Sequence, residues 1–243
     1  MTDLFAFAVG VARHAASGTM LDCYFPTPLI NPEAEVAQLI TGHFKPGVAA
    51  IDASNLDAFA QALGEGELKQ TSQALAAGSH RLVAVWLEQD SAIDSTAAAY
   101  LKLHLLSHRL ALPNSLNLDN IFAHLPNVAW TTRGPVAVEE LPAALIAAAT
   151  ANEHLEVMSV DKFPKMTNYV VPAGVRIADA SRIRLGAYLG EGTTVMHEGF
   201  VNFNAGALGP NMIEGRVSQG VTVGAHTDLG GSSSTMGTLS GGG

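Results

Sequence analysis

The sequence has a single cysteine, Cys23, among its 243 residues. One thiol cannot form an intrachain disulfide and cannot supply a cysteine-based zinc site. Basic residues are also scarce, because 13 Lys and Arg stand against 22 Asp and Glu, for a net charge of −9. A chain with this balance has no broad basic surface for a phosphate backbone. These scarcities favour a reducing, cytoplasmic location and argue against nucleic acid as a partner.

Segments for export or membrane insertion are lacking as well. The apolar N-terminus has no basic residues in front and carries an acid at Asp3, the wrong charge order for a secretory signal. The longest helical apolar stretch, near Leu141 to Ala149, contains Pro142 and falls well short of the roughly 20 residues that a bilayer span needs. With 48% hydrophobic residues, the chain can still bury a core. We therefore expect a folded protein without a membrane partner.

Composition divides the chain near residue 170, because 16 of the 24 glycines lie in residues 170–243. Residues 1–169 carry helical apolar spacings over 32–44 and over 56–77, the second with Asn55 or Asp57 as its N-cap. Two β-prone runs, 5–11 and 80–87, indicate strands. We therefore predict an α+β N-terminal domain, with helices and strands mixed, over residues 1–169.

A further helix is predicted from Asp94 to a point before Pro113. Its capped start and apolar spacing place Leu101, Leu105 and Leu112 toward a core. The same helix carries His104 and His108, which are four residues apart, a spacing that is compatible with metal binding. Since no glutamate follows His104 and leucines share this face, helix packing is the favoured role.

After residue 170 the hydrophobic period changes to six. Six aliphatic residues in succession follow this period: Val171, Ile177, Ile183, Leu189, Val195 and Val201. The period resumes in a shifted frame at Val217, Val223 and Leu229, which indicates an insertion or a bend over residues 202–216. One aliphatic residue per six predicts a parallel β-helix with three hexads in each triangular coil, over residues 170–243. A flexible glycine-rich tail is the alternative, but such linkers lack an aliphatic period.

Hexapeptide β-helices occur in acyltransferases, sugar nucleotidyltransferases, carbonic anhydrases and structural subunits, so the residues must select the function. A carbonic anhydrase is disfavoured because His197 and His226 are the only histidines after residue 170. Several blocks resemble the tetrahydrodipicolinate N-succinyltransferase family in its longer bacterial form. They are YLKLHLLSHRL (100–110), LPNVAW (125–130), SVDKFPKM (159–166), EGTTVMHEGFVNFNAG (191–206), MIEGRVS (212–218) and MGTLSGGG (236–243).

This resemblance implies a left-handed β-helix and succinyl transfer from succinyl-CoA to tetrahydrodipicolinate, in its open 2-amino-6-oxopimelate form, within lysine and diaminopimelate biosynthesis. It implies Glu214 as the active-site glutamate, acting as a general base or through an acyl-anhydride. We favour the base because the amine must lose a proton in either case. A solvated loop acid is the alternative role for Glu214.

Other site residues are also implied by the resemblance. Gly237 corresponds to a backbone N–H donor to the oxyanion, although a turn glycine is the plain alternative. Arg216, Gly231 and Ser234 correspond to substrate or cofactor contacts, and a guanidinium suits a succinyl carboxylate. A surface ion pair with Glu214 is the alternative role for Arg216.

The resemblance further implies a homotrimer with a metal on its axis, held by Glu198 from each subunit. Three carboxylates suit Mg²⁺, which prefers oxygen ligands. The resemblance also implies an aspartate near the position that Ser181 occupies in this chain. The serine departs from that pattern, and the departure bears on how strongly and how fully the metal is bound. His197 adjoins Glu198, and an ordinary polar contact is its favoured role.

Two rival functions remain at this point: another hexapeptide acyltransferase, and a non-catalytic solenoid that trimerises the N-terminal domain. The chain stops at Gly243 in mid-repeat, whereas the family continues through further coils and a segment that helps to enclose CoA. Because solenoids need capped ends, we expect a C-terminally truncated, incomplete catalytic domain.

Overall fold

The computed structural model describes residues 4–237, which form two compact units. The first unit consists of Met1–Thr27, Pro32–Tyr100 and Leu118–Pro164, and the second of Pro28–Asn31, Leu101–Asn117 and Lys165–Gly243. The chain thus combines an α+β N-terminal region with a C-terminal left-handed parallel β-helix, which confirms the predicted fold class. The predicted domain boundary between residues 169 and 170 stays a prediction.

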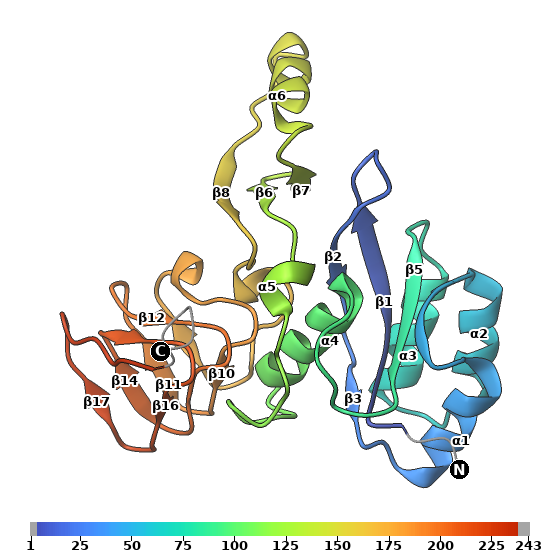
Figure 1. Cartoon of the computed structure of the whole chain (residues 1–243), viewed down its shortest axis with the longest axis horizontal. Coiled ribbons are helices and arrows are strands. Elements are labelled where there is room, and N and C mark those ends of the chain that lie inside the picture. The colour runs from blue at the N-terminus through green and yellow to red at the C-terminus, as the bar shows by residue number, and fades with distance from the viewer. Residues whose placement is uncertain (1–3, 238–243) are drawn as a thin grey trace. The chain divides into compact units, whose positions relative to one another are not determined.

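The main sheet of the first unit is antiparallel, with the strand order β2-β1-β5-β4. Its strands are β1 (Ala6–His14), β2 (Met20–Tyr24), β4 (Gly47–Ile51) and β5 (Leu82–Leu87), and the short strand β3 (Leu29–Ile30) lies between β2 and β4 in the sequence. The predicted strands over 5–11 and 80–87 are therefore confirmed. Helices α1 (Ala34–His43), α2 (Ala53–Ala62) and α3 (Glu67–Ala76) lie against one face of this sheet (Figure 1).

An aromatic cluster fixes the helices on that face. The ring of Phe7 on β1 lies 5.0 Å from the ring of Phe44 and 6.1 Å from that of Phe59. The predicted single helix over 56–77 is wrong, because α2 ends at Ala62 and α3 begins after Gly66, whose φ is 158°. The N-cap is Asp52, whose carboxylate accepts the N–H of Asn55, so α2 begins earlier than predicted.

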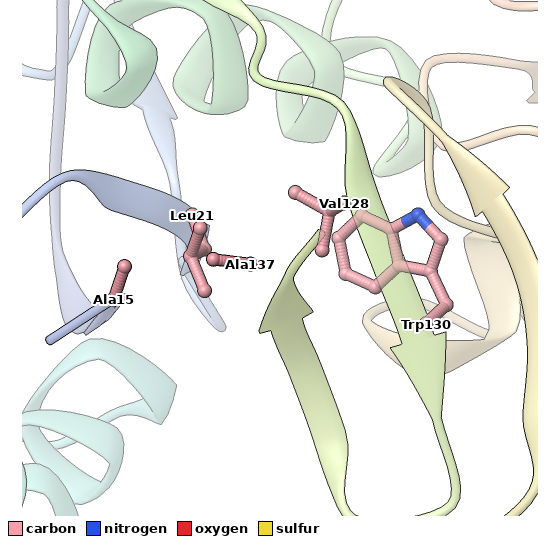
Figure 2. Close-up of a cluster of buried hydrophobic side chains, with 5 residues drawn as sticks. All are labelled: Ala15, Leu21, Val128, Trp130 and Ala137. Atoms are coloured by element: carbon pink, nitrogen blue, oxygen red, sulfur yellow. The ribbon is translucent and has the colours of Figure 1, made fainter. Parts of the chain in front are cut away.

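A smaller antiparallel sheet completes the first unit. It has the order β7-β6-β8, formed by β6 (Val128–Thr131), β7 (Gly134–Ala137) and β8 (Val157–Asp161), with α6 (Leu141–Thr150) between β7 and β8 and α5 (Ile121–His124) before β6. A buried cluster joins the β1–β2 hairpin to this sheet (Figure 2). Its members are Ala15, Leu21, Val128, Trp130 and Ala137. The indole N–H of Trp130 donates to the carbonyl of Asp161 at 3.0 Å, which satisfies its polar atom.

Helix α4 (Thr96–Ser107) runs from the first unit into the second and is buried along almost its whole length. It ends at Ser107, before Pro113 as predicted, and Arg109 just beyond it has a φ of 63°. The prediction for Leu112 is therefore wrong, since that side chain is 52% exposed, whereas Leu101 and Leu105 are fully buried. The end of α4 packs on the first coil of the β-helix: the hydroxyl of Ser107 donates to the carbonyl of Ala187 at 3.1 Å.

The β-helix has three flat faces of parallel strands (Figure 1). One face has the order β17-β14-β11-β9, the second β10-β13-β16 and the third β12-β15. The strands are β9 (Arg176–Ile177), β10 (Tyr188–Leu189), β11 (Thr193–Val195), β12 (Phe200–Val201), β13 (Gly206–Ala207), β14 (Asn211–Ile213), β15 (Arg216–Val217), β16 (Thr222–Val223) and β17 (Asp228–Leu229), with short 3₁₀ turns at η1 (Met166–Asn168) and η2 (Ala180–Arg182). Three hexads per coil are thereby confirmed.

Of the two alternatives predicted for residues 202–216, the insertion is wrong, and a bend is confined to one corner of the coil. Ala207 and Ile213 continue the six-residue period, and both are fully buried. The true irregularity is a shortening, because Val195 pairs with Ile213, eighteen positions later, whereas Ile213 pairs with Leu229, sixteen positions later. Two residues are therefore missing from one corner, between Ile213 and Val217, and the residues at that corner are Glu214 and Gly215. Val171 also lies outside the stack, since it is 69% exposed.

Candidate active site

Glu214 stands at the shortened corner of the β-helix. Its N–H and that of Gly215 both donate to the carbonyl of Leu229 on the next coil, at 2.8 and 3.0 Å. These two hydrogen bonds fix the backbone of Glu214 and Gly215 to the next coil. The Glu214 side chain is half-buried. Its Oε2 accepts the backbone N–H of Gly231 at 3.2 Å. A carboxylate fixed through one oxygen keeps the other oxygen for a proton from a bound substrate.

Arg216 lies on β15, directly after this corner, and its side chain is exposed. The next coil holds its backbone on both sides, because its N–H donates to the carbonyl of Ser233 and its carbonyl accepts the N–H of Thr235, each at 3.0 Å. The Nε–H of Arg216 donates to the hydroxyl oxygen of Ser234 at 2.9 Å. Segment 233–235 therefore fixes both the backbone and the guanidinium of Arg216.

The structure thus brings together four predicted site residues: Glu214, Arg216, Gly231 and Ser234. Among the residues that the structure describes, no ion pair joins Glu214 to Arg216, so the predicted alternative of a surface ion pair finds no support. The carboxylate is held by an amide and the guanidinium by a hydroxyl. Each charge is therefore positioned without being neutralised by the other.

Sequence reasoning missed a polar clasp beside this site, formed by Ser218 and Thr235. The Ser218 hydroxyl donates to the carbonyl of Thr235 at 2.6 Å, and the Thr235 Oγ1 accepts the N–H of Ser218 at 3.3 Å. The Thr235 hydroxyl also donates to the carbonyl of Arg216 at 2.9 Å. Ser218 and Thr235 lie on successive coils. Their pairing can be recognised in the sequence only when the length of the shortened coil is known.

Gly237 is the last residue that the structure describes. A Cβ at this position would overlap the backbone carbonyl of Gln219 and lie 3.0 Å from a methyl of Val221. Glycine is therefore required by close approach to the chain's own preceding coil. This requirement is independent of any thioester, so a larger side chain at Gly237 would perturb the coil as well as an oxyanion site. The rest of the MGTLSGGG block, residues 238–243, lies outside the described residues.

Glu198 lies at another corner of the β-helix, and its side chain is 70% exposed. Its carboxylate lies 3.6 Å from the imidazole Nε2 of His197. Arg182 fixes the backbone here, because its guanidinium donates to the carbonyls of Glu198 at 2.8 Å and Gly199 at 3.1 Å. Within residues 4–237 no cluster of three possible metal-ligating His, Cys, Asp or Glu side chains occurs. A single chain therefore presents Glu198 as an isolated, solvent-facing carboxylate.

Ser181, near which the family resemblance implied an aspartate, forms hydrogen bonds to a neighbouring acid. Its hydroxyl and its backbone N–H both donate to Asp179, at 2.7 and 2.9 Å. These two hydrogen bonds lower the pKa of the Asp179 carboxyl. The Ser181 hydroxyl is therefore occupied in this structure as a donor to Asp179.

The pair His104 and His108 packs inside the second unit. His104 is fully buried, and its ring lies 6.0 Å from that of His108 and edge-on to Tyr169 at 5.5 Å. Burial lowers the pKa of His108. The packing role that the sequence favoured agrees with this arrangement.

Of the described helices, none is long and apolar enough to cross a membrane.

Comparison with known proteins identifies the family to which the chain belongs. A family profile described as "Tetrahydrodipicolinate N-succinyltransferase middle" matches residues 125–165. The 2,3,4,5-tetrahydropyridine-2,6-dicarboxylate N-succinyltransferase of Pseudomonas putida is 54% identical over 246 residues, which covers 99% of this chain and 72% of the relative. The enzymes of that name from Pseudomonas aeruginosa and Vibrio cholerae are 53% and 46% identical, and each is covered over 72% of its length.

A solved structure supports the same assignment. The crystal structure of a putative 2,3,4,5-tetrahydropyridine-2-carboxylate N-succinyltransferase from Campylobacter jejuni superposes with a TM-score of 0.86 at 28% identity, and covers 99% of this chain and 69% of that chain. The resemblance seen in the sequence is confirmed. Identity near one half over almost the whole chain, together with this shared fold, shows that the chain belongs to the tetrahydrodipicolinate N-succinyltransferase family.

Proposed function

We propose that this protein transfers the succinyl group of succinyl-CoA to the amino group of 2-amino-6-oxopimelate, the open form of tetrahydrodipicolinate, in lysine and diaminopimelate biosynthesis. The relatives' names supply the reaction class. The observation that carries the proposal is the arrangement of Glu214 and Arg216 on one coil, held by Gly231 and Ser234 of the next. A non-catalytic solenoid has no need of a positioned carboxylate and guanidinium at the shortened corner between Ile213 and Val217.

In this reaction the substrate amine attacks the thioester carbonyl, an amide bond forms, the C–S bond breaks, and CoA leaves as its thiol. Glu214 takes the proton that the amine must lose, through the carboxylate oxygen that Gly231 does not hold. Gly231 thus serves the carboxylate in this arrangement, and its direct contact with substrate stays a prediction. Donors for the developing oxyanion are required as well, and we assign the N–H of Gly237 to this role.

Arg216 binds a carboxylate of the dicarboxylate substrate or of the succinyl group. A guanidinium accepts a carboxylate through two parallel hydrogen bonds, which fixes its direction as well as its charge. The hydrogen bond from its Nε to Ser234 leaves the terminal nitrogens for that contact. Ser234 therefore acts on the substrate by orienting Arg216.

We also propose a homotrimer in which Glu198 of each subunit faces the symmetry axis and the three carboxylates hold Mg²⁺. The fit rests on the chemistry of the side chain. Glu198 is a hard oxygen donor, it is 70% exposed, and no Lys or Arg among the described residues forms an ion pair with it. The metal would supply positive charge that offsets the repulsion of three converging carboxylates.

The free, buried thiol of Cys23 is compatible with the reducing cytoplasm as the location.

The test of the proposed reaction is release of CoA from succinyl-CoA by the purified protein, with and without 2-amino-6-oxopimelate, followed by mass analysis of the product. The proposal predicts acceptor-dependent CoA release and a succinylated product. Acetyl-CoA and an amino-sugar acceptor serve as controls for another hexapeptide acyltransferase. Acyl transfer to the sugar in preference to 2-amino-6-oxopimelate, or from acetyl-CoA in preference to succinyl-CoA, would contradict the proposal.

A further inference from the structure

A cavity of about 390 Å³ opens on the main sheet of the first unit. Its lining comes from β1, β4 and β5, with Met20 from β2. None of the predicted site residues contributes to it. Its volume lies in the lower part of the range of about 300–1,000 Å³ that is typical of small-molecule sites.

Strand alternation places this cavity on the sheet face that α1, α2 and α3 do not cover. Gly10, Val83 and Ala50 lie side by side across β1, β5 and β4. Phe7, three positions from Gly10, points to the opposite face, where it packs on the helix aromatics. The cavity lining is apolar apart from His14 and Arg81, and it includes the short side chains of Ala12, Ala50 and Val83, which suit an apolar ligand body.

Two polar side chains interrupt this apolar lining. Arg81 is exposed and, among the described residues, forms no ion pair. His14 also lines the cavity, and its Nδ1 is buried without a hydrogen-bond partner. A buried polar atom without a hydrogen-bond partner lowers the stability of the protein, and a ligand that supplies the partner removes this cost. Because the χ2 torsion of histidine is broad and roughly two-fold, the ring can present either edge to the cavity.

The charge around the cavity favours an anion. No acidic side chain lines it. The nearest acid in sequence, Asp52, follows the lining residue Ile51, but its carboxylate already accepts the N–H of Asn55 and the hydroxyl of Ser54 as the N-cap of α2. Among the described residues, neither Asp52 nor any other acid forms an ion pair with Arg81, so its charge is available to a ligand, and the imidazole adds a second hydrogen-bonding group.

We propose that this cavity binds a small monocarboxylate with an apolar body, the carboxylate at Arg81 and His14 and the body over Ala12, Ala50 and Val83. This site is separate from the residues of the proposed reaction, and the inference does not depend on that reaction. An apolar cavity with a few convergent polar groups is the ordinary form of a ligand site.

The test is isothermal titration calorimetry of the full chain with hexanoate, and with hexanol as the neutral analogue. Hexanoate should bind, and hexanol should bind at least about tenfold more weakly, because it lacks the charge-assisted contact. Arg81→Gln should weaken hexanoate binding by about tenfold or more, and Ala50→Phe, which fills the cavity, should abolish it. Lys45→Gln removes an exposed cation of the same unit outside the lining and should leave binding unchanged.

Circular dichroism melting of each variant establishes that the fold is kept. Absence of hexanoate binding to the parent protein would overturn the proposal, as would binding that Arg81→Gln and Ala50→Phe leave unaltered. A third outcome is that the parent protein does not bind hexanoate and that Ala50→Phe changes the oligomeric state. This outcome would identify the face as an interface between copies of the chain and would also overturn the proposal.

Discussion

Two glutamates of the β-helix differ in their surroundings, and the difference separates their proposed roles. Glu214 is half-buried, and a backbone N–H holds one oxygen of its carboxylate in place. Glu198 faces solvent beside His197, and in the proposed trimer three copies of it would form the metal site. Their sequence motifs suggested both roles by resemblance, but the hydrogen bond to Gly231 was not predictable, because it depends on the length of the coil that follows Glu214.

At the residue scale, Arg216→Lys should raise KM for the carboxylate-bearing substrate by about tenfold while changing kcat less. Lysine keeps the charge but loses the planar fork and the Nε–H that Ser234 orients. Steady-state kinetics measure the effect. Arg176→Lys, on an exposed strand arginine of the same β-helix, is the matched control. Equal KM values for both variants would remove Arg216 from substrate binding.

The buried thiol gives a second prediction at this scale. Burial raises the pKa of Cys23 far above its usual value, and the nearby Asp22 raises it further. Since the thiolate is the reactive form, Cys23 should be alkylated by iodoacetamide at mildly alkaline pH much more slowly than glutathione, and rapidly once urea unfolds the chain. Mass spectrometry follows the reaction. Native alkylation at the rate of glutathione would show that the thiol is accessible.

At the scale of elements, periodicity predicted the β-helix and part of the first unit, but not the small sheet of β6, β7 and β8. The β-helix was visible because one aliphatic residue must fill each hexad, and α1 and β5 followed from simple apolar patterns. Residues 202–216 were misread because Ala207 supplies a hexad with a side chain too small to count as aliphatic. The break between α2 and α3 at Gly66 was missed because the apolar spacing continues across it. In both places tertiary packing, which the sequence pattern does not show, decides the outcome.

The stack of aliphatic side chains can be tested with two valines of the same predicted period. Val201 is fully buried and Val171 is 69% exposed. Val201→Ala should destabilise the protein by about 2 kcal/mol, because two methyl groups are lost and a cavity remains. Val171→Ala should change stability by less than about 0.5 kcal/mol. Urea unfolding followed by circular dichroism measures both, and similar costs would refute the assignment of the stack.

At the scale of the whole molecule, the family assignment rests on identity along nearly the entire chain, whereas assembly is a proposal. Sedimentation should give a mass three times the 25.3 kDa of one chain. Glu198→Ala should remove axial Mg²⁺, measured by elemental analysis after dialysis, and Glu191→Ala, another exposed acid of the β-helix, should not. A monomer would contradict the trimer, and equal metal content in both variants would contradict the metal site.

The central claim is that Glu214 takes the amine proton, and kcat of Glu214→Gln tests it most directly. Glutamine keeps the shape and an oxygen for the Gly231 N–H but cannot accept the proton. We predict a fall in kcat of about 10²-fold or more, with the sedimentation profile unchanged, whereas Glu191→Gln should behave like the parent. A kcat for Glu214→Gln within a few-fold of the parent would contradict the account.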